Sequence, residues 1–222
     1  MPRRLSIAAV VLLVLPMARA GEVLDRLAAT VNGNVLLLSD VDEEIRYECF
    51  TSKRSLQELT DKDKSAALDR LIDQELLREQ MRSADFKPVK PEETEKALES
   101  LKSDYSNNAA NESWTGALAA YGITERTVRS HIETELNQLH LIELRLRPSI
   151  QIDSETVKTY YREQLLPKLP PGQRTILEEA TPTIREVLLQ QKMNESLESW
   201  LQALRAQAQI QRFSGAAGAQ SQ

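Results

Sequence analysis

One short segment, residues 24–45, carries a hairpin signal and a helix-start signal, and it constrains the fold more than any other part of the chain. Two apolar runs, 28–31 and 35–38, flank an Asn-Gly-Asn triplet. Asn-Gly supplies the positive φ angles that a tight two-residue turn needs, so the pattern predicts a β-hairpin. Ser39 follows directly and is predicted to cap a helix, because its hydroxyl can accept from first-turn amides and acidic residues come after it.

The rest of the chain has the composition of a helical protein. Glycine is scarce, with 7 in 222 residues, and aromatic residues make up 5% of the chain, whereas Leu, Glu, Gln, Arg and Ala abound. Apolar residues recur at three- and four-residue spacing with charged residues between them, which predicts amphipathic helices. The expected helices cover residues 40–50, 61–83, 92–103, 113–121, 124–147, 154–161 and 181–209.

Several predicted helix ends are marked by residues that satisfy unpaired backbone groups. Thr124, Asp153 and Thr181 stand where an N-cap is expected. Gly122 stands just past a predicted helix, where glycine tolerates the left-handed conformation of a helix C-terminus. A Ser-Asn-Asn triplet at 106–108 predicts a break after the third helix.

The first twenty residues predict export from the cytoplasm. Arg3 and Arg4 precede an apolar stretch, and an A-x-A triplet ends at residue 20, so residues 1–20 match a secretory signal peptide. Removing them leaves 25 basic and 33 acidic residues, a net charge of −8, which argues against nucleic acid as a partner. No later segment approaches the roughly 20 apolar residues that span a bilayer. We therefore expect a periplasmic protein without stable membrane insertion.

The sequence contains no constellation typical of an enzyme. His131 and His140 are nine residues apart on one predicted helix, roughly 13 Å along its axis, so they cannot share a metal within one chain. His140 is expected at the edge of the core. The single Cys49 cannot form an internal disulfide and is expected to be a half-buried helix residue; a reactive thiol and an intermolecular link are the alternatives. We expect no enzymatic activity, no cofactor and no metal site.

Two segments resemble a known family. The wording VNG-V-L-SDVD in the hairpin and following helix is similar to the start of SurA-type periplasmic chaperones, whose relatives carry parvulin prolyl-isomerase domains. Residues 150–161 resemble the I-x-I-D-x-E-x-V-x-x-Y-Y stretch that precedes the first parvulin domain in that family. Residues 210–213 alternate polar and apolar, which suits a strand, and the resemblance implies that this strand pairs with the opening hairpin. Residues 167–180, where a parvulin domain would stand, are too few to form one.

The resemblance implies one chaperone core rather than several domains. We expect a mostly α, multi-helix SurA-type core over residues 21–213, with a small antiparallel β element formed by the N-terminal hairpin and the C-terminal strand. In this organisation the segment 21–166 is completed by the helix and strand of 181–213, and 167–180 is a short linker. Residues 214–222 are small and polar and are expected to form a disordered tail.

The implied function is an ATP-independent holdase that binds unfolded exported or outer-membrane proteins in an apolar groove, without isomerase activity. The candidate client-binding residues are apolar or aromatic and are those least obviously needed by the core: Met81, Phe86, Trp114, Leu118, Tyr121, Tyr160, Tyr161 and Leu165. Ordinary packing is the alternative for each. Two other functions stay open, a prolyl isomerase with an unrecognised site and an assembly or scaffolding subunit with one dedicated partner. A homodimer formed by helix or strand exchange also stays open.

Overall fold

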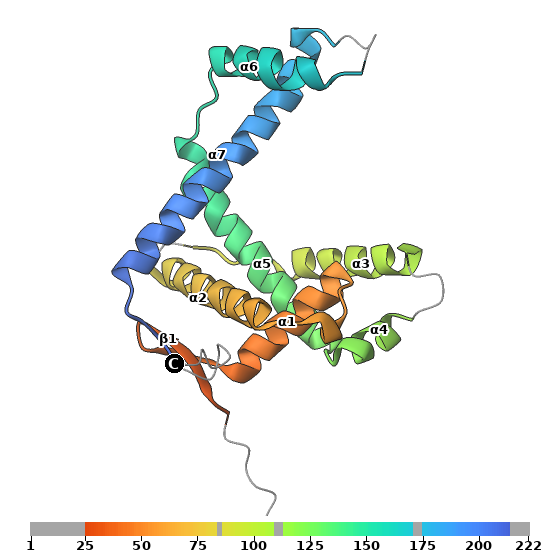
Figure 1. Ribbon diagram of the computed structural model, residues 1–222, viewed down its shortest axis with the longest axis vertical. Coiled ribbons are helices and arrows are strands. Elements are labelled where there is room, and N and C mark those ends of the chain that lie inside the picture. The colour runs from red at the N-terminus through yellow and green to blue at the C-terminus, as the bar shows by residue number, and fades with distance from the viewer. Residues whose placement is uncertain (1–24, 84–85, 109–112, 171–174, 214–222) are drawn as a thin grey trace, which may run out of the picture.

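The computed structural model of the protein describes residues 25–83, 86–108, 113–170 and 175–213 (Figure 1). The predicted signal peptide, the predicted C-terminal tail and the middle of the predicted linker lie outside the described residues. The elements in chain order are β1 (Leu27–Val31), β2 (Asn34–Leu37), α1 (Leu38–Ser52), η1 (Leu56–Glu58), α2 (Asp61–Ser83), α3 (Pro91–Asn108), α4 (Trp114–Tyr121), α5 (Glu125–Leu146), η2 (Arg147–Ser149), α6 (Ser154–Tyr160), η3 (Tyr161–Leu165), η4 (Leu166–Lys168), α7 (Leu177–Gln207) and β3 (Ile210–Arg212). The predicted fold class is confirmed: the protein is mostly α-helical with one small antiparallel sheet.

The molecule has two parts that are joined by the helices α5 and α7 (Figure 1). The main body contains the sheet, α1 to α4, and the parts of α5 and α7 that pack on them. α5 leaves this body, and α7 returns to it from the far end, where α6 lies, and crosses α5 on the way. We call the far end the distal lobe and define it as residues 150–170 together with 175–189.

The opening hairpin forms as predicted. β1 and β2 pair antiparallel around Asn32 and Gly33, whose φ angles of 49° and 87° are those of a type I′ turn. β3 pairs antiparallel with the other edge of β1, so the strand order is β2-β1-β3. The amide of Phe213 donates to the carbonyl of Ala28 at 3.0 Å. The predicted pairing of the C-terminal strand with the hairpin is therefore confirmed, with β1 as its partner.

The predicted Ser39 cap is wrong. α1 begins at Leu38, directly after β2, so Ser39 already lies inside the helix. Its hydroxyl donates to the carboxylate of Asp25 instead. The cap interaction is made by Asp40, whose carboxylate accepts from the amide of Leu37 at 2.8 Å. A strand that runs into a helix without a loop leaves no position for a serine cap, and the acidic residue at the third helical position takes over.

Other helix ends follow the sequence prediction in part. The hydroxyl of Thr124 and the carboxylate of Asp153 accept from first-turn amides, and Gly122 adopts the left-handed conformation, as predicted. The predicted Thr181 cap is wrong, because α7 begins at Leu177 and the Thr181 hydroxyl donates to the Leu177 carbonyl inside the helix. α7 therefore starts earlier than the predicted linker allows.

The predicted break at 106–108 is also wrong, since α3 runs to Asn108. Tyr105 in its last turns is buried and stacks on Phe50, with ring centroids 5.8 Å apart. This packing outweighs the poor helix propensity of Ser-Asn-Asn, because tertiary contacts override local preference when an aromatic ring is buried.

Two hydrophobic clusters make up the interior of the main body. One lies between the sheet and the helices α1 and α2, and Leu204, Ala208 and Ile210 from the C-terminal end of the chain pack against it. The other surrounds Phe50 and brings α1, α3, α4 and α5 together. Both ends of the described chain thus contribute to one interior. Among the described helices, none is both long and apolar enough to cross a bilayer.

Candidate functional site

The eight predicted client-binding residues lie in three separate places. Trp114, Leu118 and Tyr121, all on α4, pack in the cluster around Phe50 in the main body. The Trp114 ring meets Phe50 edge-on at 5.5 Å, and its indole nitrogen donates to Glu125 at 3.0 Å. Leu118 is only 5% exposed. The apolar surface of α4 is therefore used by packing within the molecule.

Met81 and Phe86 lie at the end of α2 and in the segment that follows it. Both side chains are half-buried. The Phe86 ring meets the exposed His140 of α5 edge-on at 5.6 Å, which places His140 on the surface rather than at the core edge. The amide of Val89 donates to Asn137 of α5 at 2.8 Å and holds this segment against the helix. Phe86 covers part of α5, and neither Met81 nor Phe86 lines the hollows described below.

Tyr160, Tyr161 and Leu165 come together in the distal lobe. They pack against a small interior formed by Val157, Ala180, Ile184 and Leu188. The Tyr161 hydroxyl donates to the carbonyl of Thr175 at 2.6 Å, which ties the π-helical turn η3 to the start of α7. Three of the eight predicted residues thus share one location, and a π-turn of this kind is common at functional sites.

Beside these residues lies a hollow of about 260 Å³. Its lining is mainly apolar and consists of Tyr160, Leu165, Thr175, Glu179, Ala180, Thr183, Ile184 and Val187. Two large apolar side chains of the same lobe, Leu166 and Ile176, are 42% and 54% exposed. The distal lobe therefore offers both a recess and exposed apolar surface next to it, which is the usual character of a site for apolar ligands.

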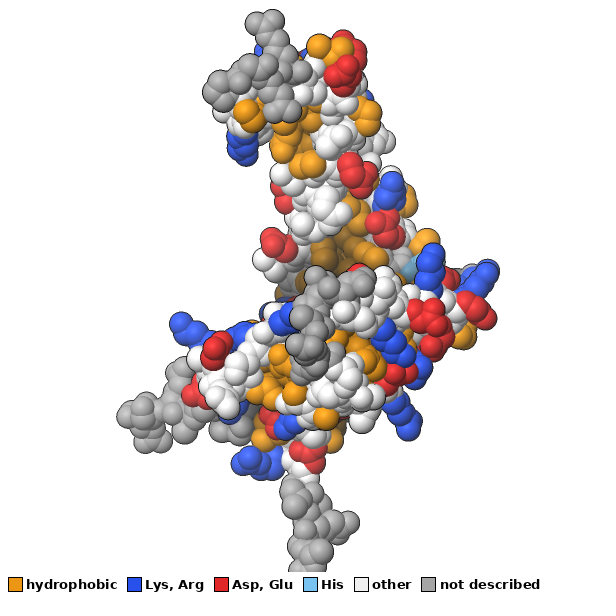
Figure 2. All heavy atoms as spheres, turned by 90° about the vertical axis from the view of Figure 1, so that its right-hand side faces the viewer, with side chains coloured by type: hydrophobic (Ala, Val, Ile, Leu, Met, Phe, Trp, Pro, Cys, Tyr) orange, Lys and Arg blue, Asp and Glu red, His pale blue; other side chains and the backbone are white. Residues whose placement is uncertain are grey.

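A second apolar surface lies on α5 between the two parts of the molecule. Leu139 and Leu144 are each 56% exposed there. Figure 2 shows apolar side chains gathered in the hollowed waist between the main body and the distal lobe, and again on the lobe itself. An extended chain could contact both surfaces at once.

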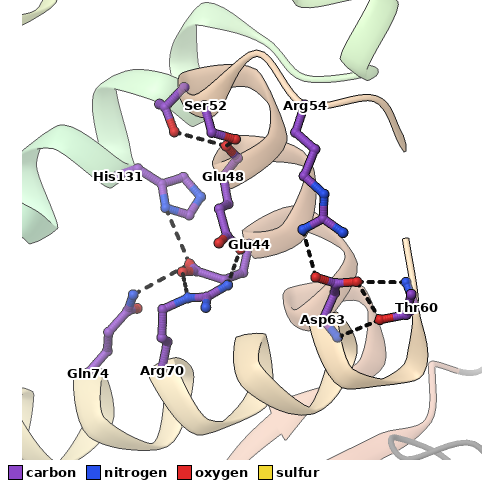
Figure 3. Close-up of polar contacts among 10 residues, drawn as sticks. Glu44, Glu48, Ser52, Arg54, Thr60, Asp63, Arg70, Gln74 and His131 are labelled. Carbon is purple, nitrogen blue, oxygen red and sulfur yellow. Dashed lines mark hydrogen bonds and ion pairs between the residues drawn. The ribbon is translucent and has the colours of Figure 1, made fainter. Parts of the chain in front are cut away.

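The main body contains a polar cluster that the sequence patterns do not predict. Glu44 of α1 is buried and lies between Arg70 of α2, at 3.2 Å, and His131 of α5, at 3.7 Å (Figure 3). The His131 ring stacks on Tyr47 with centroids 4.1 Å apart and an angle of 9° between the planes. The helical spacing indicates this position, because Glu44 falls on the same face of α1 as the buried Val41. Glu44 is therefore more than a complement to the helix dipole.

Burial sets the proton affinities in this cluster. It lowers the pKa of His131, an effect that the charges of Glu44 and Glu43 partly oppose. Burial also raises the pKa of Tyr47, and Glu135 and Glu44 raise it further. In the described part of the chain no group of three or more His, Cys, Asp and Glu side chains is placed to hold a metal ion. The cluster joins three helices through charge and stacking.

Cys49 is more deeply buried than the sequence predicts. It is 2% exposed and packs in the cluster beneath the sheet, where burial raises the pKa of its thiol. A thiol with a raised pKa is mostly protonated near neutral pH and is a poor nucleophile. Its position fits packing better than redox chemistry.

The described residues define a two-part helical protein with a small terminal sheet and an apolar recess in the distal lobe. No protein-family model matches the chain, and no curated protein matches it either.

Proposed function

We propose that the protein is an exported, ATP-independent holdase that binds unfolded polypeptides through the apolar surface of its distal lobe. The observation that carries the proposal is the 260 Å³ hollow beside Tyr160 and Leu165, next to the exposed Leu166 and Ile176. These side chains lie on a lobe that stands away from the main body. Their apolar surface is accessible to a partner, unlike that of α4.

The physical basis is weak hydrophobic contact at several points. Burying apolar surface stabilises a complex by roughly 25 cal/mol per Å², so one recess of this size holds a single side chain with modest affinity. Contacts at the lobe and at Leu139 and Leu144 of α5 would act together on one chain and raise the effective affinity. Such binding requires no defined client sequence and no nucleotide.

The resemblance to SurA-type chaperones supports this function and suggests its setting. The signal-peptide pattern of residues 1–20 supports a periplasmic location, and outer-membrane proteins in transit are the clients we propose. Only a short segment separates η4 from α7, so the proposed chaperone binds clients without isomerising their prolines.

A test by aggregation suppression uses matched pairs of exposed side chains. The double variant Leu166→Ser and Ile176→Ser removes apolar surface from the distal lobe, where these residues are 42% and 54% exposed. The control variant Leu27→Ser and Val35→Ser removes similar surface from the sheet, where the residues are 42% and 51% exposed. Light scattering of an unfolded outer-membrane protein is followed with each variant in several-fold excess, and circular dichroism checks the fold.

We expect the wild type and the sheet variant to suppress aggregation, and the lobe variant to require several-fold more protein for the same effect. Equal suppression by both variants would mean that the binding surface does not lie on the distal lobe. No suppression by the wild type would refute the holdase function. Tight binding of one protein without suppression of unrelated clients would identify a dedicated assembly partner, and catalysis in a proline-limited refolding assay would identify an isomerase.

A further inference from the structure

A second hollow, of about 340 Å³, lies where the distal lobe meets α5. It is bounded by the segment after α5 and by α7, on a different face of α7 from the apolar recess. Ile150, Ile152 and Leu189 supply apolar lining. Its volume falls within the roughly 300 to 1,000 Å³ of ordinary ligand sites.

Two arginines from different elements border this hollow, Arg147 at the end of α5 and Arg185 on α7. One guanidinium nitrogen of Arg185 donates to the carbonyl of Ile152 at 2.7 Å, which fixes the position of the group. Arg147 forms an exposed ion pair with Glu143 at 3.3 Å. A guanidinium carries five N–H donors, so each arginine keeps donors for a ligand. Two such groups beside one recess suit a carboxylate, which accepts paired N–H bonds.

Pro182, inside α7, also borders the hollow and adds to its apolar lining.

We propose that this hollow binds the C-terminal residue of an extended polypeptide. The apolar side chain rests on Ile150, Ile152 and Leu189, and the terminal carboxylate pairs with Arg147 and Arg185. This inference rests on the proposed holdase function and specifies one feature that the holdase recognises in its clients.

The negative side chain of Glu186 also borders the hollow. It lies close to where the carboxylate would bind and opposes it, so the substitution Glu186→Gln is expected to tighten binding of a free C-terminus. A fatty acid shares this apolar carboxylate chemistry, so the experiment below includes decanoate to distinguish the two ligands. The peptide is the ligand that fits the proposed holdase function.

The test compares two peptides that differ in one group. An eight-residue peptide ending in phenylalanine, labelled at its N-terminus, is prepared with a free carboxylate and with a C-terminal amide. Fluorescence anisotropy with the full chain should give about tenfold tighter binding of the free acid, since charge-assisted hydrogen bonds are lost on amidation. Arg147→Gln and Arg185→Gln should each reduce this preference, whereas Arg126→Gln, an exposed arginine near the other end of α5, should preserve it.

Three results would overturn the inference. They are equal affinity for the acid and the amide, a preference that survives both arginine substitutions, and displacement of the acid peptide by decanoate at equal affinity, which would assign the hollow to fatty acids. Aggregation suppression is measured in parallel on each variant. If the wild type does not suppress aggregation, the holdase function is refuted. If it suppresses aggregation but binds the acid and amide peptides equally, only the C-terminus site is refuted.

Discussion

The main body and the distal lobe contain apolar side chains of the same kinds but use them differently. In the main body, Phe50 is enclosed by Tyr105, Trp114 and Tyr121, which are buried or half-buried. In the distal lobe, the buried interior is small, and Leu166 and Ile176 are exposed beside a recess. Composition alone therefore does not separate stabilising surface from binding surface. What separates them is how many elements close around each side chain.

The strongest test of this comparison is truncation of the aromatic centre of the main body. Phe50 is 2% exposed and contacts rings from α3 and α4, so Phe50→Ala should destabilise the protein by about 3 to 5 kcal/mol. Urea unfolding followed by tryptophan fluorescence measures the change, because Trp114 lies against Phe50. A loss below about 1 kcal/mol would mean that the cluster collapses around the cavity and is not tightly packed.

A smaller effect, confined to one part, is expected from the interior of the distal lobe. Ile184 is 2% exposed and belongs to a cluster of only four buried residues. Ile184→Ala should cost about 2 kcal/mol, the low end for such a change, because few partners surround the side chain. Hydrogen exchange should show faster exchange in α6 and the first half of α7, with β1 and α2 unchanged. Equal loss of protection in β1 would contradict the two-part description.

Sequence patterns predicted the elements of both parts but not how they meet. The Asn32-Gly33 turn, the Thr124 cap and the Asp153 cap depend on nearby backbone geometry, and each was predicted from a few residues. Ser39 and Thr181, although predicted as caps, lie inside their helices. Their helices begin earlier, at Leu38 after β2 and at Leu177, where local signals are weak.

Whether a predicted residue lines the recess also depends on contacts between elements that are distant in the sequence. Tyr160 and Leu165 line the recess because α6 and η3 fold back on the first turns of α7, and no periodicity reports that contact. Leu118 has the same apolar character but is covered by other elements of the main body. Exposure after folding, rather than residue type, distinguishes them, and the sequence carries no direct record of it.

The smallest expected effect is a loss of folding stability at low pH. It is expected in the main body, where the buried His131 titrates. Burial holds the pKa of His131 below its usual 6.5, so the folded state binds fewer protons than the unfolded state. The stability that the neutral ring contributes is present above the unfolded pKa, near 6.5, and is lost as pH falls through the folded value. Glu135, whose pKa is raised by burial, acts in the opposite direction. The net acid effect should therefore be modest.

The variant His131→Phe isolates the contribution of His131 to the pH dependence, because it keeps an aromatic ring stacked on Tyr47 and removes the titrating group. Urea midpoints measured from pH 7.5 to pH 5 should fall less steeply for the variant than for the wild type. In the wild type, hydrogen exchange should quicken first in α1 and α5 as the pH falls, because Glu44 and His131 join these helices. Exchange in α6 should not change. Identical slopes for both proteins would mean that water reaches the imidazole freely. Earlier loosening of α6 than of α1 would place the acid-sensitive contact in the distal lobe and reverse the comparison.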